Sequence, residues 1–431
     1  MILERAAPCY TVRKSLSLSG DTTAFMPSFE TKRPAETAGI DARQDFSLVL
    51  GGPLFQLLRR AHLSGDALQL VRQRMLVILA LTWLPLLVLS ILEGQALGGR
   101  ASVPFLRDVE AHARFLVALP LLIVAELVVH ERMRRVVRQF LDRKLIPEGA
   151  RPRFDAAVAS AFRLRNSVLA EVLLIAVVYM LGILVLWRHY IALSTTATWY
   201  AMPAAQGMTL SFTGTWYAYV SLPLFQFLLA RWYYRIFIWA RFLWQVSRIE
   251  LSLIPTHPDR VGGLGFLANI AYAFTPLAVA HGGMLAGVIA GRIFYLGAAL
   301  PDFKVEIVVL IVFLLSLVFG PFLVFAPQLA SAKRTGLGEY GTLAERYVRE
   351  FDAKWLRGGA PADESMVGSA DIQSLADLAN SFDVVKTMRI APITKDALLR
   401  IVAAALVPVV PLALTMMSLE ELLKRLAGIL F

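Results

Sequence analysis

Seven apolar segments constrain the fold of this chain, because each is long enough, or nearly so, to cross a lipid bilayer. A membrane-spanning helix needs about 20 mostly apolar residues. The segments are 75–92, 115–129, 168–187, 217–240, 266–290, 306–328 and 401–419. Only 17% of the residues are charged, against ~25% in soluble domains. The predicted fold class is therefore all-α, a polytopic transmembrane helix bundle of about seven spans.

Lysine and arginine are divided unevenly between the two sets of loops. Of these residues, 35 lie in 1–74, 130–166, 230–265 and 330–400, and eight lie in the remaining loops and the C-terminal tail. Because cytoplasmic loops carry the basic excess, the pattern predicts a multi-pass protein of the cell inner (cytoplasmic) membrane with a cytoplasmic N-terminus. Seven spans would place the C-terminus outside, whereas a re-entrant last segment would return it to the cytoplasm.

The domain organisation follows from these spans. Residues 1–45 are polar and lack the apolar core of a secretory signal, which predicts a disordered cytoplasmic tail. Residues 46–74 include "PLFQLLRR", typical of an amphipathic helix at the membrane interface. The membrane domain, 75–329, holds spans one to six. Residues 330–400 predict cytoplasmic amphipathic helices that form a subdomain, and 401–431 hold the last span and tail.

Four charged residues lie inside the predicted spans. Glu126 and Glu171 fall at about the same depth near the basic side, and Arg231 and Arg235 share one face of the fourth span. Burying any of them alone is costly, so mutual pairing is expected. The functional interpretation is an ion or proton pathway, to which His281 in the fifth span also belongs. The alternative is a set of structural salt bridges and one satisfied histidine.

Two further spans carry helix-packing or gating signals. Gly283, Gly287 and Gly291 recur at four-residue steps, which lets another helix approach closely. The last span contains Pro408 and Pro411, which bend a helix, followed by Thr415. These three residues are candidates for a pore or gate, and an ordinary bent helix is the alternative.

The segment "LSLIPTHPDRVGGLGFL" joins the fourth and fifth spans on the basic side. Its candidate functional residues are His257, Asp259, Arg260, Gly262 and Gly263. The glycines do not match a phosphate-binding loop, which needs a lysine at fixed spacing. Arg260 and the glycine amides are suited to an anionic lipid headgroup, whereas a turn fixed by prolines and glycines is the structural alternative.

Several function classes find no support in the sequence. Cys9 is the single cysteine, so neither an intramolecular disulfide nor a cysteine-rich metal site can form. No catalytic set, metal constellation or cofactor motif stands out. The net charge of +11 is interpreted as the basic excess of a membrane protein, and no nucleic-acid partner is expected.

The loop segment, together with "DIQSLADLANSFDVV" and "PLFQLLRR", resembles segments of uncharacterised bacterial multi-pass membrane proteins. The resemblance spans most of the chain and implies a membrane location, with no activity attached to it.

Three functions fit these features. The first is a homo-oligomeric ion channel or pore, based on the bent last span, the glycine face and the cytoplasmic helices. The second is a secondary transporter that uses the intramembrane glutamates and arginines. The third is a membrane-embedded sensor or enzyme that uses the His-Pro-Asp-Arg loop. The expected partners are the lipid bilayer, further copies of the chain and anionic lipid headgroups.

Overall fold

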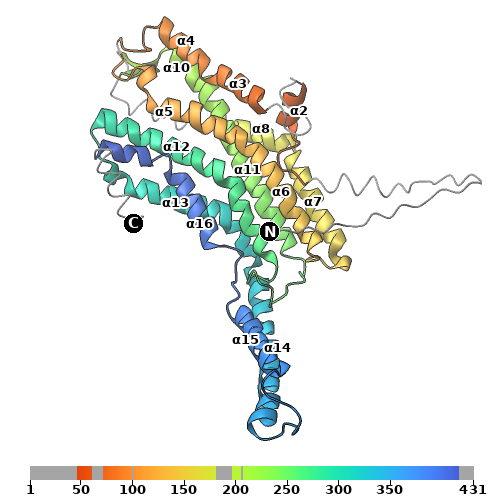
Figure 1. Ribbon diagram of the computed structural model, residues 1–431. Helices are drawn as coiled ribbons and strands as arrows, with labels where there is room; N and C mark the ends of the chain where they lie inside the picture. The colour runs from red at the N-terminus through yellow and green to blue at the C-terminus, as the bar shows by residue number, and fades with distance from the viewer. Residues whose placement is uncertain (1–45, 61–70, 100, 181–196, 205–206, 417–431) are drawn as a thin grey trace, which may run out of the picture. The chain divides into compact units, whose positions relative to one another are not determined.

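The computed structural model describes residues 46–60, 71–99, 101–180, 197–204 and 207–416, all within one compact unit, Gln44–Phe431. The described chain is almost entirely helical (Figure 1). Its one sheet is a two-stranded antiparallel hairpin of β1 (Ala201–Ala204) and β2 (Gly207–Leu210). The expectation of a helical protein is confirmed, and the hairpin is a small departure from an all-α fold.

The first half of the chain supplies several helices that are interrupted near prolines. α2 (Pro53–Arg60) precedes α3 (Val71–Thr82) and α4 (Leu84–Leu92), which join at Trp83 next to a proline. α5 (Val109–His112) continues through a π-helical segment, Ala113–Ala118, into α6 (Leu119–Asp142). The remaining helices here are α7 (Arg151–Arg165), α8 (Val168–Val177), α10 (Phe212–Trp216) and α11 (Leu222–Val246).

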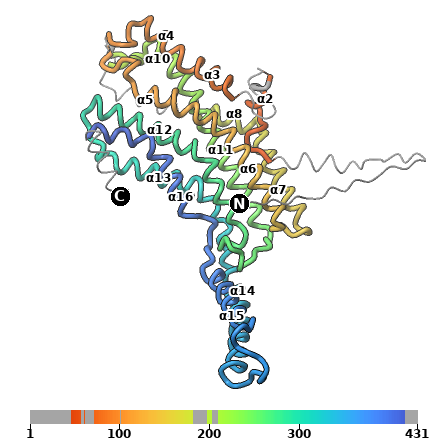
Figure 2. The backbone as a smooth tube through the Cα atoms, viewed as in Figure 1, coloured from red at the N-terminus to blue at the C-terminus, as the bar shows by residue number. Residues whose placement is uncertain are grey.

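The second half forms longer helices. α12 (Ile270–Leu296) packs against α6, the π-helical segment and α16 (Lys395–Leu406), and Figure 2 shows α12 and α16 side by side. α13 (Lys304–Phe319) leads through a 3-10 segment, Gly320–Phe325, into α14 (Ala326–Phe351). α14 pairs with α15 (Ala370–Lys386) as a helical hairpin. The two amphipathic helices predicted within 330–400 are thus present.

Within the described residues, four helical stretches are long and apolar enough to cross a membrane: Val71–Leu92, Val109–Asp142, Leu264–Leu296 and Leu300–Leu356. Each overlaps one of the seven predicted spans. Among the other three predictions, α11 is long enough, but its arginines and aromatic residues lower its mean hydropathy. The apolar helix around α8 is described only as Val168–Met180, and α16 has 12 residues.

The apolar helices expose apolar side chains on the surface of the molecule. On α13, Val305, Val308, Val309 and Val312 are each more than half exposed and recur on one helical face. Exposed apolar faces of this extent are unusual in soluble proteins and match lipid contact. The interior is filled by aromatic side chains, including Trp232, Trp239 and Phe242 of α11. These features together indicate a helical membrane protein.

Candidate functional site

Glu126 in α6 is the centre of a buried group of charged side chains. Arg235 Nη2 in α11 donates a hydrogen bond to Glu126 Oε1 at 2.7 Å. Arg74 Nη2 in α3 lies 2.6 Å from Glu126 Oε2, and Arg231 Nη1 in α11 lies 4.0 Å from Oε1. Three arginines from two other helices therefore surround one carboxylate.

Glu171, in the first turn of α8, extends this group to two further helices. Its Oε1 lies 3.5 Å from Arg231 Nη2, and its Oε2 accepts a hydrogen bond from the Leu54 amide at 2.8 Å. Leu54 is in the first turn of α2, so the carboxylate also satisfies a free amide at the start of that helix. We refer to Arg74, Glu126, Glu171, Arg231 and Arg235 as the charge cluster.

All five members of the charge cluster are buried, with exposed fractions between 3% for Arg74 and 9% for Glu171. Removing a charge from water costs several kcal/mol unless partners compensate it. Here three guanidinium groups face two carboxylates, which leaves a formal charge of +1 among these five residues. Arg74 Nη2 lies within hydrogen-bond distance of Glu126, whereas Arg231 approaches its two carboxylates only to 3.5 Å and 4.0 Å. The charge cluster therefore holds an excess positive charge, and Arg231 is its most loosely paired member.

The structure brings together the four charged residues that the sequence singled out and adds Arg74. Sequence reasoning missed Arg74 because it falls in the stretch assigned to the interfacial helix, one residue before the predicted first span. In the structure α3 begins at Val71, so Arg74 is inside the helix and points at α6. The sequence did offer one signal for its burial: Arg74 stands directly before a long apolar run.

His281 lies apart from the charge cluster, on α12. Its Nδ1 lies 2.7 Å from the Leu277 carbonyl oxygen, and its Nε2 lies 2.8 Å from the Tyr233 hydroxyl of α11. A carbonyl only accepts, so Nδ1 carries the hydrogen and the Tyr233 hydroxyl donates to Nε2. Both ring nitrogens are satisfied, which is the arrangement expected of a neutral histidine that joins two helices.

The loop between α11 and α12 is organised around the Asp259 carboxylate. Its Oδ1 accepts hydrogen bonds from the amides of Val261 and Gly263, and its Oδ2 accepts one from Gly265 at 2.8 Å. Burial alone would raise the pKa of this carboxyl, but these amide hydrogen bonds and the adjacent His257 hold the pKa below its usual range. His257 Nδ1 lies 2.9 Å from Asp259 Oδ1.

Left-handed backbone lets the loop fold around this carboxylate. Arg260, Gly262 and Gly263 have φ values of 57°, 65° and 97°, a region that glycine enters without strain and other residues rarely occupy. The Arg260 side chain points outward, with Nη2 4.0 Å from Asp383 Oδ2 of α15. Arg389 donates to the Asp259 carbonyl oxygen at 3.0 Å, so the loop is tied to the segment that precedes α16.

The last apolar segment is broken at the predicted prolines. α16 ends at Leu406, Pro408 follows, and the chain continues as a 3-10 helix, Val410–Thr415, that contains Pro411. Thr415 Oγ1 donates to the Leu412 carbonyl oxygen at 2.6 Å. Residues 417–431 are outside the described residues, so the spanning or re-entrant course of this segment stays a prediction.

The glycine face of α12 makes its contacts within the chain. A Cβ at Gly287 would come within 2.7 Å of the Ala113 Cβ, and one at Gly283 within 3.4 Å of Val117. Gly291 faces open space. The closest approach on α12 belongs to Gly282, which was not predicted: a Cβ there would come within 2.0 Å of the Ala405 carbonyl oxygen. This glycine sets the spacing between α12 and α16.

The long apolar helices define the class of this protein, a helical membrane protein, and the charge cluster is its most unusual feature. Within the described ranges, no group of three or more histidine, cysteine, aspartate or glutamate residues is arranged to hold a metal ion. Comparison with protein-family models, curated proteins and solved structures finds no match.

Proposed function

We propose that this protein is a secondary transporter that moves a small anion coupled to protons, with the charge cluster as its binding site. The observation that carries the proposal is the buried excess of positive charge. Ionisable residues inside membrane proteins are rare and commonly mark ion or proton pathways. An anion is the ligand that would neutralise this excess.

Arg231 is the residue that favours binding over a purely structural network. Its contacts with Glu171 and Glu126, at 3.5 Å and 4.0 Å, are longer than the contacts that Arg74 and Arg235 make with Glu126. Guanidinium groups bind carboxylates and phosphates best through paired hydrogen bonds. A small anion accepting from Arg231 would make a closer contact than either carboxylate does, and Arg74 would be the second contact.

Glu126 supplies the coupling to protons in this proposal. An anion that draws the three arginines away from Glu126 would remove the charges that keep its carboxylate ionised, and the carboxylate could then take up a proton. Loss of the anion would then favour the ionised carboxylate again. Proton and anion would thus bind together, and one carboxylate is sufficient for the coupling.

The topology proposed with this function has seven spans in the inner membrane and a cytoplasmic N-terminus. The 35 basic residues on one side support that orientation. It places the charge cluster in the cytoplasmic half of the bilayer, close to the basic loops. The α14–α15 hairpin would then lie in the cytoplasm.

Proton flux in proteoliposomes tests this proposal. An internal pH dye would report proton movement after addition of chloride, nitrate, phosphate, acetate or succinate. We expect at least one anion to drive proton entry in the wild type. Arg74→Gln should abolish that flux, because it removes the excess positive charge while leaving two arginines to face two carboxylates.

Glu345→Gln is the matched control, since Glu345 is an exposed partner of Arg349 on α14. It should transport as the wild type does. Absence of flux with all five anions, or unchanged flux in a folded Arg74→Gln variant, would contradict the proposal.

The second candidate is a homo-oligomeric channel, which the broken last helix favours. Apolar side chains on its 3-10 segment, including Val410 and Leu414, are exposed in the single chain, as expected if further copies surround them. Single-channel recording and crosslinking through a Leu414→Cys variant would test this alternative. A monomer without conductance would exclude it.

A further inference from the structure

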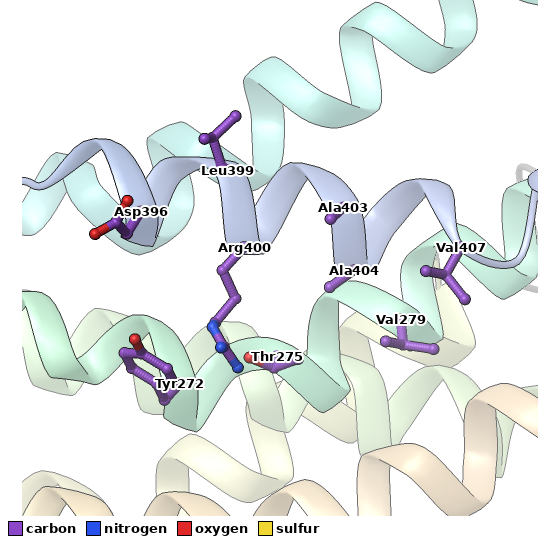
Figure 3. A pocket seen from close by; sticks show the side chains of 9 residues that line it. All are labelled: Tyr272, Thr275, Val279, Asp396, Leu399, Arg400, Ala403, Ala404 and Val407. Atoms are coloured by element: carbon purple, nitrogen blue, oxygen red, sulfur yellow. The ribbon is translucent and has the colours of Figure 1, made fainter. Parts of the chain in front are cut away.

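A groove of about 550 Å³ lies between the N-terminal half of α12 and the length of α16. Figure 3 shows its two kinds of lining. Tyr272, Asp396 and Arg400 lie at the end where both helices begin, and Val279, Ala403 and Val407 lie further along them. The groove is thus polar at one end and apolar at the other.

Two arginines contact the ring of Tyr272, which lies at the polar end. The Arg400 guanidinium carbon lies 4.0 Å from the ring centre, and that of Arg132, from α6, lies 5.4 Å from it. Figure 3 shows Arg400 extending from α16 toward α12, next to Tyr272 and Thr275. Cation–π contact holds both side chains in place, although the two positive charges repel one another.

Neither guanidinium is paired with a carboxylate. Within the described residues, Arg132 and Arg400 take part in no ion pair and in no side-chain hydrogen bond. Asp396 is one turn before Arg400, yet it does not come within ion-pair distance, and Figure 3 shows it directed away from that guanidinium. The polar end therefore has one cation in its lining, Arg400, and a second, Arg132, against the same tyrosine ring, and neither is paired with an anion.

Apart from Thr275, the rest of the groove is lined by apolar side chains. Val279 is seven residues beyond Tyr272, about 10 Å deeper along the helix, inside one of the four membrane-length helices. Ala403 leaves the floor shallow, whereas Leu399 and Val407 are 66% and 60% exposed on either side of it. A linear hydrocarbon chain fits this shape and this position.

We propose that this groove binds one anionic phospholipid, with its phosphate at Arg132 and Arg400 and an acyl chain along Val279, Ala403 and Val407. The Tyr272 hydroxyl lies at the same end and can donate to a phosphate oxygen. Charge complementarity selects an anionic headgroup, and the apolar half selects a lipid over a free anion. The site is separate from the charge cluster and does not depend on its function.

Lipid retention by the purified full-length chain tests the assignment. Native mass spectrometry would compare phosphatidylglycerol, phosphatidylcholine and inorganic phosphate as added probes. We expect the wild type to retain one phosphatidylglycerol in preference to phosphatidylcholine. Arg132→Gln/Arg400→Gln should weaken its retention roughly 30-fold, the change expected for two basic residues at a membrane surface.

Two further variants separate a built site from general surface charge. Arg138→Gln/Arg151→Gln removes the same charge from exposed positions outside the groove and should retain the lipid as the wild type does. Ala403→Trp fills the groove with both arginines intact and should weaken retention to a similar extent. Equal losses in the two double variants, full retention in Ala403→Trp, or phosphate competing as well as the lipid would each overturn the proposal.

Discussion

The charge cluster and the α14–α15 hairpin use the same chemical groups in opposite surroundings. On α14, Arg349 pairs with Glu345, and their side chains are 78% and 63% exposed. Glu126 and its arginine partners are at most 9% exposed. An exposed pair gains little, because water solvates either partner alone, whereas a buried group that loses its partner keeps the full cost of desolvation. The comparison implies that losing a carboxylate without an anion to replace it costs far more in the charge cluster than in the hairpin.

The largest expected effect is that of Glu126→Gln. This substitution leaves three buried arginines with Glu171 as their single carboxylate, and we expect the free energy of unfolding to fall by roughly 3–5 kcal/mol. Unfolding in mixed micelles, followed by circular dichroism as the denaturing detergent increases, measures it. A loss below about 1 kcal/mol would show that water reaches the charge cluster.

Gly282→Ala tests whether a tightly packed position without charge is as sensitive to substitution as the charge cluster. The added Cβ would overlap the Ala405 carbonyl oxygen, so α12 and α16 must separate, and we expect a loss of about 2–3 kcal/mol. The same unfolding measurement applies. Gly291→Ala, on the same helix but facing open space, is the control and should not destabilise the protein.

Asp259→Asn tests a half-buried carboxylate that backbone amides, not arginines, hold in place. The amide nitrogen of asparagine cannot accept from the loop, so we expect a loss of about 1–2 kcal/mol at pH 7. Because the pKa of Asp259 is depressed from 3.8, the stabilisation is complete above that value and disappears as the pH falls through the lower folded value. The difference between wild type and variant should therefore shrink below about pH 4, and a constant difference would refute this explanation.

Glu345→Gln should have the smallest effect. Its ion pair with Arg349 is exposed and joins two residues one helical turn apart. Such pairs typically stabilise a protein by about 0.3–0.5 kcal/mol. We expect the unfolding midpoint to stay within the error of the measurement, at low salt as well as high. A loss approaching that of Glu126→Gln would break the comparison between the two regions.

The sequence predicted those features that local pattern determines. Runs of apolar residues identified the long helices, and charged residues at equal depth identified four members of the charge cluster. The amphipathic repeat from Tyr340 to Trp355 predicted a helix that the structure extends back to Ala326. Its start could not be predicted, because the apolar residues before it read equally well as the end of a membrane span.

Features that depend on contacts between residues far apart in the sequence could not be predicted. Arg74 joins the charge cluster through Glu126, 52 residues further along the chain, and the residues next to Arg74 do not indicate that partner. Asp259 was recognised as a polar loop residue, but its role as acceptor for three amides depends on the left-handed backbone of Arg260 and the glycines. Gly282 was overlooked because its small size matters only where Ala405 arrives.

That contact between α12 and α16 also has a consequence for biosynthesis. Ala405 follows Gly282 by 123 residues, so at ~5–20 residues per second the ribosome completes α16 roughly 6–25 s after it has passed Gly282. Throughout that interval the groove-forming side of α12 lacks its permanent neighbour, and lipid or the insertion machinery must occupy its place. Assembly of the bundle thus ends with a late helix displacing a temporary occupant from an early one.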